Sequence, residues 1–353
     1  MSSPAQCSLV KPRHLRPGDT IAAVTPSWGA PGAFPERYQA GKRQLEQAFN
    51  VKVVEMPHTL RPPEWVAANP RARAQDLMGA FADSAISGIF ATIGGADSIR
   101  LLPFLDLDVI RANPKVFLGF SDITSLHLAC HAAGLVTFYG PTVMAGFGEN
   151  GGIHRFTADG VRRALFQVEP IGVVPPNDEG WTAGPTDWSD ARLQMLPRPL
   201  ETAEPPRILQ GRGVVSGPLL GGCAEVLEMA KGTAWWPANG RWDGAILFYE
   251  TSEDAPDPKW IRYWLRNYAA QEILGSLAGV LLARPDPRGD STYRNRLEAE
   301  VLEGLAEAGL SKLPVLSGLD FGHTMPMMTL PYGVHAQIDC TAATLTITEA
   351  GVV

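Results

Sequence analysis

The stretch Lys115–Gly134, KVFLGFSDITSLHLACHAAG, decides the fold class of this chain. Its beginning, Val116–Phe120, is a short apolar run, and such a run predicts a strand that is buried on both faces. A helix is predicted to start directly behind it, with Ser121 at the junction. A buried strand that leads into a helix is the repeating unit of α/β folds, in which helices cover the faces of a parallel sheet.

The same alternation of strand and helix runs through residues 1–145. Four more buried strands are predicted at Thr20–Val24, Val51–Val54, Gly88–Ile93 and Val136–Tyr139. Helical stretches lie between them, among them Glu36–Phe49 and Arg71–Ala82. The pattern predicts an α/β domain with a parallel sheet, and the ligands of such domains bind beyond the carboxyl ends of the strands.

The regular pattern fades over residues 168–212, where Pro, Gly, Asp and Trp accumulate, and this predicts a linker or a loop over the site. Regular elements return from Gly213. Strands are predicted at Ala245–Tyr249, Gly279–Leu282, Leu313–Leu319, Val334–Ile338 and Thr344–Ile347, and helices at Pro258–Ala270 and Tyr293–Ala308. The expected parts are an N-terminal α/β domain (1–167), a linker with an active-site loop (168–212), and a mixed α/β C-terminal domain with a β-rich end (213–353).

The composition argues against several classes of function. A net charge of −7 and a pI near 5.6, without any basic tract, argue against nucleic-acid binding, which requires clustered Lys and Arg. Apolar runs fall short of the roughly 18 residues that a membrane span needs, and no secretory signal is recognised, so a cytoplasmic protein is expected. Cys7, Cys130, Cys223 and Cys340 lack metal-ligand spacing, which predicts free, mostly buried thiols and no metal site.

Ser121 is the first candidate for chemistry. It lies where the sheet's carboxyl edge meets a helix N-terminus, and backbone N–H groups and the helix dipole can stabilise negative charge there. The nucleophile elbow of α/β-hydrolases has the same architecture, although Gly-Phe-Ser-Asp-Ile lacks its second glycine. Serine is also a good N-cap, so the segment alone leaves a nucleophile and a helix cap both open.

Three further segments follow predicted strands. Gly94 and Gly95 would let backbone amides approach an oxyanion or a phosphate, although a glycine pair is also common in plain turns. Glu250 ends a strand and could orient a histidine, or it could belong to a solvated acidic turn with Glu253 and Asp254. His323 lies in a loop constrained by Gly and Pro, and could move a proton near neutral pH.

His127 and His131, at i and i+4 on the helix after Ser121, could suggest metal ligands. Without an HExxH pattern or a nearby carboxylate, a core or surface pair is the better interpretation.

Taken together, these segments resemble the LD-carboxypeptidase and microcin C immunity family of serine peptidases. The motifs that carry the resemblance are KPRHLRPGDTIAAVTPS (11–27), GGADSIRLLPFLD (94–106), NPKVFLGFSDIT (113–124), LVTFYGP (135–141), GPLLGGCAEVLEMAKGT (217–233), LFYETSED (247–254) and DFGHTMPMMTLPYG (320–333). They occur in the family's order and span nearly the whole chain.

The resemblance implies a serine hydrolase with Ser121 as nucleophile, His323 as general base and Glu250 as its orienting carboxylate. We expect the backbone N–H groups of Asp122 and Gly95 to form the oxyanion hole. The family's fold is a flavodoxin-like N-terminal domain followed by a swivelling β-rich C-terminal domain, and homodimers are usual in it. No metal or organic cofactor is required.

The motifs also indicate a branch of the family. Cell-wall LD-carboxypeptidases typically carry RGGYGSxR where this chain has IGGADSIR, which is similar to the immunity-type enzymes. That branch implies a small peptidyl- or aminoacyl-nucleotide substrate, contacted by Gly94, Asp97 and Ser98, with Trp181 or Trp188 stacking on the base. The alternatives are release of D-alanine from muropeptide tetrapeptides and a binder without turnover. One departure is Cys223, where the family more often has Asn, and it leaves the specificity open.

Overall fold

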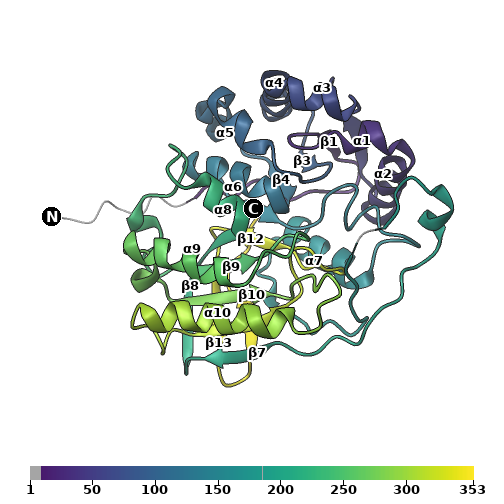
Figure 1. The fold of residues 1–353 in the computed structure, drawn as a ribbon. Coiled ribbons are helices and arrows are strands. Elements are labelled where there is room, and N and C mark those ends of the chain that lie inside the picture. The colour runs from purple at the N-terminus through teal and green to yellow at the C-terminus, as the bar shows by residue number, and fades with distance from the viewer. Residues whose placement is uncertain (1–8, 185) are drawn as a thin grey trace.

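The computed structural model describes residues 9–184 and 186–353, which form two sheets surrounded by helices (Figure 1). The strands of the first sheet are β1 (Thr20–Val24), β2 (Lys52–Glu55), β3 (Gly88–Ala91), β4 (Val116–Gly119), β5 (Thr137–Tyr139) and β12 (Leu330–Tyr332). Those of the second are β6 (Gly172–Val173), β7 (Arg207–Gln210), β8 (Val214–Cys223), β9 (Ile246–Glu250), β10 (Gly279–Ala283), β11 (Val315–Leu319), β13 (His335–Asp339) and β14 (Thr344–Ile347).

The α-helices are α1 (Ala30–Ala33), α2 (Pro35–Phe49), α3 (Pro63–Ala68), α4 (Pro70–Ala82), α5 (Leu107–Ala112), α6 (Thr124–Ala132), α7 (Arg155–Leu165), α8 (Ala224–Ala230), α9 (Lys259–Ala270) and α10 (Tyr293–Glu307). Short 3-10 helices are η1 (Ser98–Phe104), η2 (Ser121–Ile123), η3 (Ala191–Met195), η4 (Asn239–Arg241) and η5 (Leu274–Ser276).

The first sheet has the order β12-β5-β4-β3-β1-β2, and its strands β1 to β5 are parallel. Apolar side chains project from both faces of this sheet, because successive residues of a strand point to opposite faces. In β1, Ile21 and Ala23 share a buried cluster with side chains of α2 and α7, whereas Ala22 and Val24 share another with α4 and α6. The uninterrupted apolar strands of the sequence are explained by this coverage of both faces.

The second sheet has the order β6-β14-β13-β8-β9-β10-β11-β7. Its centre, β8 to β11, is parallel, whereas β7, β13, β14 and β6 pair antiparallel at its two ends. The predicted fold class is therefore confirmed: a parallel-sheet N-terminal part is followed by a second, mixed sheet with a β-rich end.

The strands and helices predicted from residue patterns all occur, with bounds that differ by at most two residues. Four strands had no such prediction: β6 and β7, which lie in the segment predicted as a linker or loop, and β8 and β12. β8 contains Pro218 and several glycines, which lower strand propensity, and the three-residue β12 contains Pro331, which is tolerated because β12 lies at the sheet edge.

Chain order and spatial order differ at two places. β12 comes from the C-terminal part of the chain, yet it pairs with β5 in the first sheet. Residues 168–212 supply β6 and β7, which lie at opposite ends of the second sheet. This segment is therefore more than a linker, because its strands pair with β14 and β11.

The two sheets pack against each other through aromatic side chains. Phe248 of β9 lies 5.2 Å from the ring of Tyr139 in β5 and 5.6 Å from that of Tyr332 in β12, measured between ring centroids. Figure 1 shows the N-terminal elements, purple to blue, above the green and yellow C-terminal elements, with the teal connecting segment running down one side. The carboxyl ends of β3, β4 and β9 consequently meet between the two halves.

Candidate active site

Ser121 lies directly beyond β4 and begins η2. Its backbone has a φ of 63°, in the left-handed region that non-glycine residues rarely adopt. Such a conformation costs roughly 1–3 kcal/mol and persists where the surroundings impose it. The N-cap position of α6 is Ile123, so Ser121 does not cap that helix. The strained turn instead presents the Ser121 hydroxyl at the carboxyl edge of the sheet.

His323 and Glu250 form a hydrogen-bonded chain with Ser121. His323 Nε2 lies 3.0 Å from Ser121 Oγ, and His323 Nδ1 donates to Glu250 Oε2 at 2.6 Å. Burial lowers the pKa of His323, but the carboxylates of Glu250 and Glu253 outweigh this effect and hold the pKa well above 6.5. The arrangement has the order of a nucleophile, a base and an orienting carboxylate.

Two glycines permit this approach. A Cβ atom on Gly94 would lie 2.9 Å from Ser121 Oγ, and one on Gly322 would lie 2.6 Å from Glu250 Oε2. Gly322 also has a φ of 85°, which a residue with a side chain rarely adopts. Only glycine therefore fits at both positions.

Tyr139 connects the nucleophile to the carboxylate. Its hydroxyl accepts the N–H of Ser121 at 3.0 Å and donates to Glu250 Oε1 at 2.5 Å. The ring is fully buried, and burial followed by the charge of Glu250 raises the pKa of Tyr139 well above 10, so the hydroxyl keeps its proton. Residue patterns did not single out Tyr139, although its place at the end of the strand beside β4 was the available signal.

Of the Gly94–Gly95 turn, Gly94 lies against Ser121, whereas Gly95 lies against Ser27 and Trp28. Among the described residues, neither the Asp122 N–H nor the Gly95 N–H has a hydrogen-bond acceptor. Both amides are therefore free to donate to a substrate oxygen.

Asp97 and Ser98 have structural partners. The carboxylate of Asp122 accepts both of their backbone N–H groups, at 2.9 and 2.7 Å, and the Ser27 hydroxyl at 2.5 Å. Asp97 is ion-paired with Arg73 at 2.6 Å, and the buried Ser98 hydroxyl donates to the Asp122 carbonyl. Neither Asp97 nor Ser98 lines the cavity described next, in contrast to Gly94 and Gly95. Their contacts tie the glycine turn to the strand end that carries Ser121.

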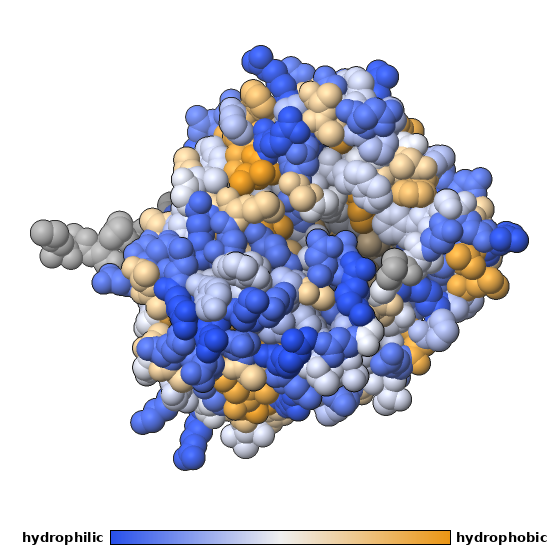
Figure 2. All heavy atoms as spheres, viewed as in Figure 1, coloured by the Kyte–Doolittle hydropathy of each residue, from blue (hydrophilic) through white to orange (hydrophobic). Residues whose placement is uncertain are grey.

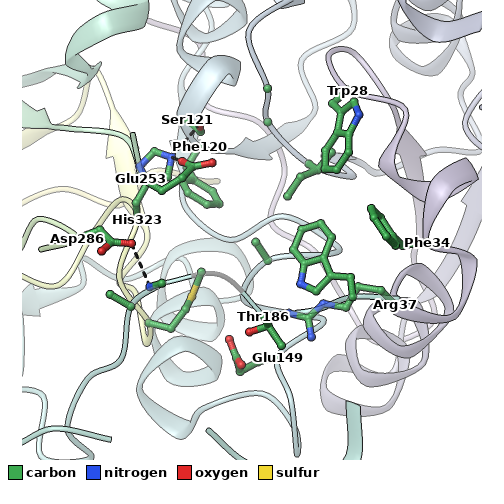
Figure 3. A pocket seen from close by; sticks show the side chains of 18 of the residues that line it. Trp28, Phe34, Arg37, Phe120, Ser121, Glu149, Thr186, Glu253, Asp286 and His323 are labelled. Carbon is green, nitrogen blue, oxygen red and sulfur yellow. Dashed lines mark hydrogen bonds and ion pairs between the residues drawn. The ribbon is translucent and has the colours of Figure 1, made fainter. Parts of the chain in front are cut away.

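A cavity of about 420 Å³ opens beside Ser121, which is within the usual size of small-molecule sites. The surface in Figure 2 is hollowed between the upper and lower halves of the molecule. Ser121, His323 and Glu253 lie at one end of the cavity, and Trp28, Phe34 and Arg37 lie at the other (Figure 3). The Ser121–His323 pair and the aromatic side chains thus line one cavity.

The two tryptophans of the 168–212 segment differ in position. Trp188 lines the cavity, where its ring stacks on Trp28 with centroids 6.3 Å apart and meets Phe34 edge-on at 5.8 Å. The Arg37 guanidinium lies 5.2 Å from its centroid. Trp181 does not line the cavity, and Arg284 lies over its ring. Of the two, Trp188 is the one available to a ligand.

Glu253 differs from the expected solvated acid. Its side chain is 57% exposed, yet Oε2 lies 3.0 Å from His323 Nε2. The hydrogen bond from His323 is the main reason that the pKa of Glu253 falls to about 2. His323 Nε2 therefore has two neighbours, the Ser121 hydroxyl and a second carboxylate.

His127 and two of the described cysteines lie in the core. His127 contacts Thr137 Oγ1 at 2.8 Å and the Gly119 carbonyl at 2.9 Å, as a core histidine does. In the described ranges no group of three or more potential ligands could hold a metal ion. Cys130 and Cys223 are buried thiols and Cys340 is half-buried, while Cys7 lies outside the described residues. No helix in residues 9–184 or 186–353 is long and apolar enough to cross a membrane.

Known protein families match both halves of the chain. Residues 21–140 match the LD-carboxypeptidase N-terminal domain, and residues 216–338 match the LD-carboxypeptidase C-terminal domain. The microcin C7 self-immunity protein MccF of Escherichia coli is 30% identical over 95% of this chain and 94% of its own length. A murein tetrapeptide carboxypeptidase of Pseudomonas aeruginosa is 36% identical over 85 residues, which are 24% of this chain and 27% of that protein.

Solved structures agree with these matches. Unliganded MccF superposes with a TM-score of 0.86 at 28% identity, covering 98% of this chain and 100% of MccF. MccF in complex with aspartyl sulfamoyl adenosine gives a TM-score of 0.85 with the same identity and coverage. A MccF-like protein from Streptococcus pneumoniae in complex with AMP gives 0.83 at 30% identity, covering 93% of this chain and 98% of that one.

The chain belongs to the LD-carboxypeptidase family of serine peptidases. It is a carboxypeptidase-like hydrolase, and its relatives include an immunity protein as well as a cell-wall peptidase.

Proposed function

We propose that this chain is a serine amidohydrolase of the microcin C immunity type. It would cleave the carboxamide or phosphoramide bond of peptidyl- or aminoacyl-nucleotide compounds by way of an acyl-enzyme. The observation that carries the proposal is one cavity with Ser121 and His323 at one end and stacked tryptophans at the other; the buried Glu250 lies behind His323 and accepts its Nδ1–H.

In the proposed mechanism, His323 Nε2 takes the Ser121 proton as Oγ attacks the carbonyl carbon. Glu250 holds the imidazole through Nδ1 and stabilises the imidazolium. The oxyanion receives hydrogen bonds from the N–H groups of Asp122 and Gly95. His323 then protonates the leaving nitrogen, and a water molecule hydrolyses the acyl-Ser121 ester with His323 again as base.

The far end of the cavity suits a nucleoside. Trp28 and Trp188 present flat aromatic surface, and base stacking on such a ring contributes about 1–3 kcal/mol. The comparisons support this assignment, since MccF holds aspartyl sulfamoyl adenosine and the streptococcal relative holds AMP.

The alternative is an LD-carboxypeptidase that releases D-alanine from muropeptide tetrapeptides. It is supported by the family assignment and by the similarity to the murein tetrapeptide carboxypeptidase. A non-catalytic binder is a weaker candidate, because Ser121 and His323 lie within hydrogen-bonding distance.

The deciding experiment is a side-by-side hydrolysis screen with a panel of aminoacyl sulfamoyl adenosines and a muropeptide tetrapeptide. We expect higher kcat/KM for the nucleotide compounds. Faster release of D-alanine would favour the alternative, and failure of an active-site serine reagent to label Ser121 would favour a binder. The three-part division of the chain and a homodimeric state stay predictions, which limited proteolysis and light scattering can check.

A further inference from the structure

The cavity carries negative charge beside the nucleophile. Glu253 Oε2 and Ser121 Oγ lie at the same distance, 3.0 Å, from His323 Nε2. In Figure 3 the Glu253 side chain lies next to His323 and Ser121, at the end of the cavity away from Trp28. The mechanism above assigns no task to this carboxylate.

The other carboxylates of the cavity have partners within the protein. Glu149 is held by Arg198 through two hydrogen bonds, Asp286 accepts the N–H groups of Gly184 and Arg288, and Asp187 accepts Ser189. Arg288 contacts the backbone carbonyl of Glu253, and its guanidinium lies 3.9 Å from Asp254. Among the described residues, His323 is the only ionisable side chain that forms a hydrogen bond with the Glu253 carboxylate.

We propose that Glu253 is a specificity residue that binds the α-ammonium group of the acyl residue, so that the enzyme selects aminoacyl compounds with a free amino terminus. In such compounds the α-nitrogen lies two bonds, about 2.5 Å, from the carbonyl carbon. Ser121 Oγ must approach that carbon to about 3–3.5 Å, so the ammonium lies within about 6 Å of Oγ. The Glu253 carboxylate occupies this region. The inference rests on the proposed function and narrows its substrate class.

The contact between the substrate ammonium and Glu253 also affects the protonation state of His323. In the free enzyme His323 lies between Glu250 and Glu253, and both carboxylates raise the pKa of its imidazole and so favour the imidazolium. When an ammonium group pairs with Glu253, this carboxylate leaves Nε2, and the imidazolium releases its proton to water. The neutral Nε2 can then accept the proton of Ser121. In a muropeptide tetrapeptide the α-nitrogen of the attacked residue is an uncharged amide, so such a substrate does not supply this positive charge.

The test compares two compounds: the aminoacyl sulfamoyl adenosine that the screen shows to be cleaved fastest, and its N-acetyl derivative. For the wild-type protein we expect kcat/KM to be at least about tenfold higher with the free amine, equivalent to one well-placed charge pair of about 1.4 kcal/mol. Glu253→Gln should reduce this ratio to near one, mainly through a loss with the free amine. Asp254→Asn, whose side chain is 92% exposed on the same turn, should keep the wild-type ratio.

A wild-type ratio near one, or a ratio that survives in Glu253→Gln, would overturn the role of Glu253 while leaving the proposed function standing. If the wild-type protein cleaves no compound of the panel, the proposed function itself fails, and the role of Glu253 fails with it. Thermal unfolding of each variant confirms that the turn substitutions leave the fold intact, which separates selectivity from a structural effect.

Discussion

Removal of the Tyr139 hydroxyl is expected to weaken both the fold and the chemistry. The hydroxyl is the acceptor for the Ser121 N–H at 3.0 Å and donates to Glu250 at 2.5 Å, and all three residues are buried. In Tyr139→Phe, the N–H loses its partner, which costs about 1–3 kcal/mol, and a hydrogen bond to a charged group is lost, which is worth about 1.5–3 kcal/mol. The expected loss of unfolding free energy is therefore about 3–5 kcal/mol, a large share of the usual 5–15 kcal/mol.

Catalysis should suffer as well, because Glu250 and the strained Ser121 turn lose the group that fixes both. We expect kcat to fall by about tenfold to a hundredfold, the scale of a small misplacement in an active site. Urea unfolding measures the loss of stability as a shift in the midpoint urea concentration, provided that the slope of unfolding free energy against urea stays unchanged. A hydrolysis assay measures kcat.

Tyr249→Phe is the matched control for this substitution. Tyr249 precedes Glu250 on the same strand, is 3% exposed, and its hydroxyl has no hydrogen-bond partner among the described residues. Removing an unsatisfied buried hydroxyl should leave stability unchanged or slightly higher. If Tyr139→Phe unfolded at the same urea concentration as Tyr249→Phe, with wild-type kcat, the bridging role of Tyr139 would be refuted.

Four other predictions concern the catalytic chain and the cavity. Ser121→Ala should lower kcat by several orders of magnitude while binding and folding persist, and near wild-type turnover would remove Ser121 as nucleophile. Glu250→Gln should keep the fold but reduce kcat strongly, because a neutral amide cannot stabilise imidazolium; an unchanged rate would contradict this role. Trp188→Ala should raise KM about tenfold for an adenylate but little for a tetrapeptide, with Trp181→Ala as control, and equal effects on both substrates would indicate packing alone. Since the pKa of His323 is held well above 6.5 and the base must be neutral, kcat/KM should rise with pH through a pKa above 6.5, and a plateau already reached at pH 6 would contradict the ion pairs.

Local sequence patterns were sufficient for the elements and for the chain segments that carry the site. The run Val116–Phe120 is apolar because both faces of β4 are covered, and the same periodicity revealed the other parallel strands. Ligands of parallel sheets bind beyond the carboxyl ends of the strands, so Ser121, Gly95 and Glu250 could be selected as candidate site residues by their position. The roles proposed for them came from the family resemblance, because each residue alone also fitted a cap, a turn or a solvated acid.

The contacts between residues that are far apart in the chain were decided only by the tertiary structure. Ser121 and His323 are 202 positions apart, and Tyr139 and Glu250 are 111 apart, so their contacts depend on how the two sheets pack. The same packing brings Trp28 against Trp188 and leaves Trp181 outside the cavity. It also turns Glu253, an ordinary acidic residue of an exposed turn by sequence, toward the imidazole of His323. Residue periodicity records which face of a strand or helix is buried, whereas the partner that a polar side chain meets is set by the placement of whole elements.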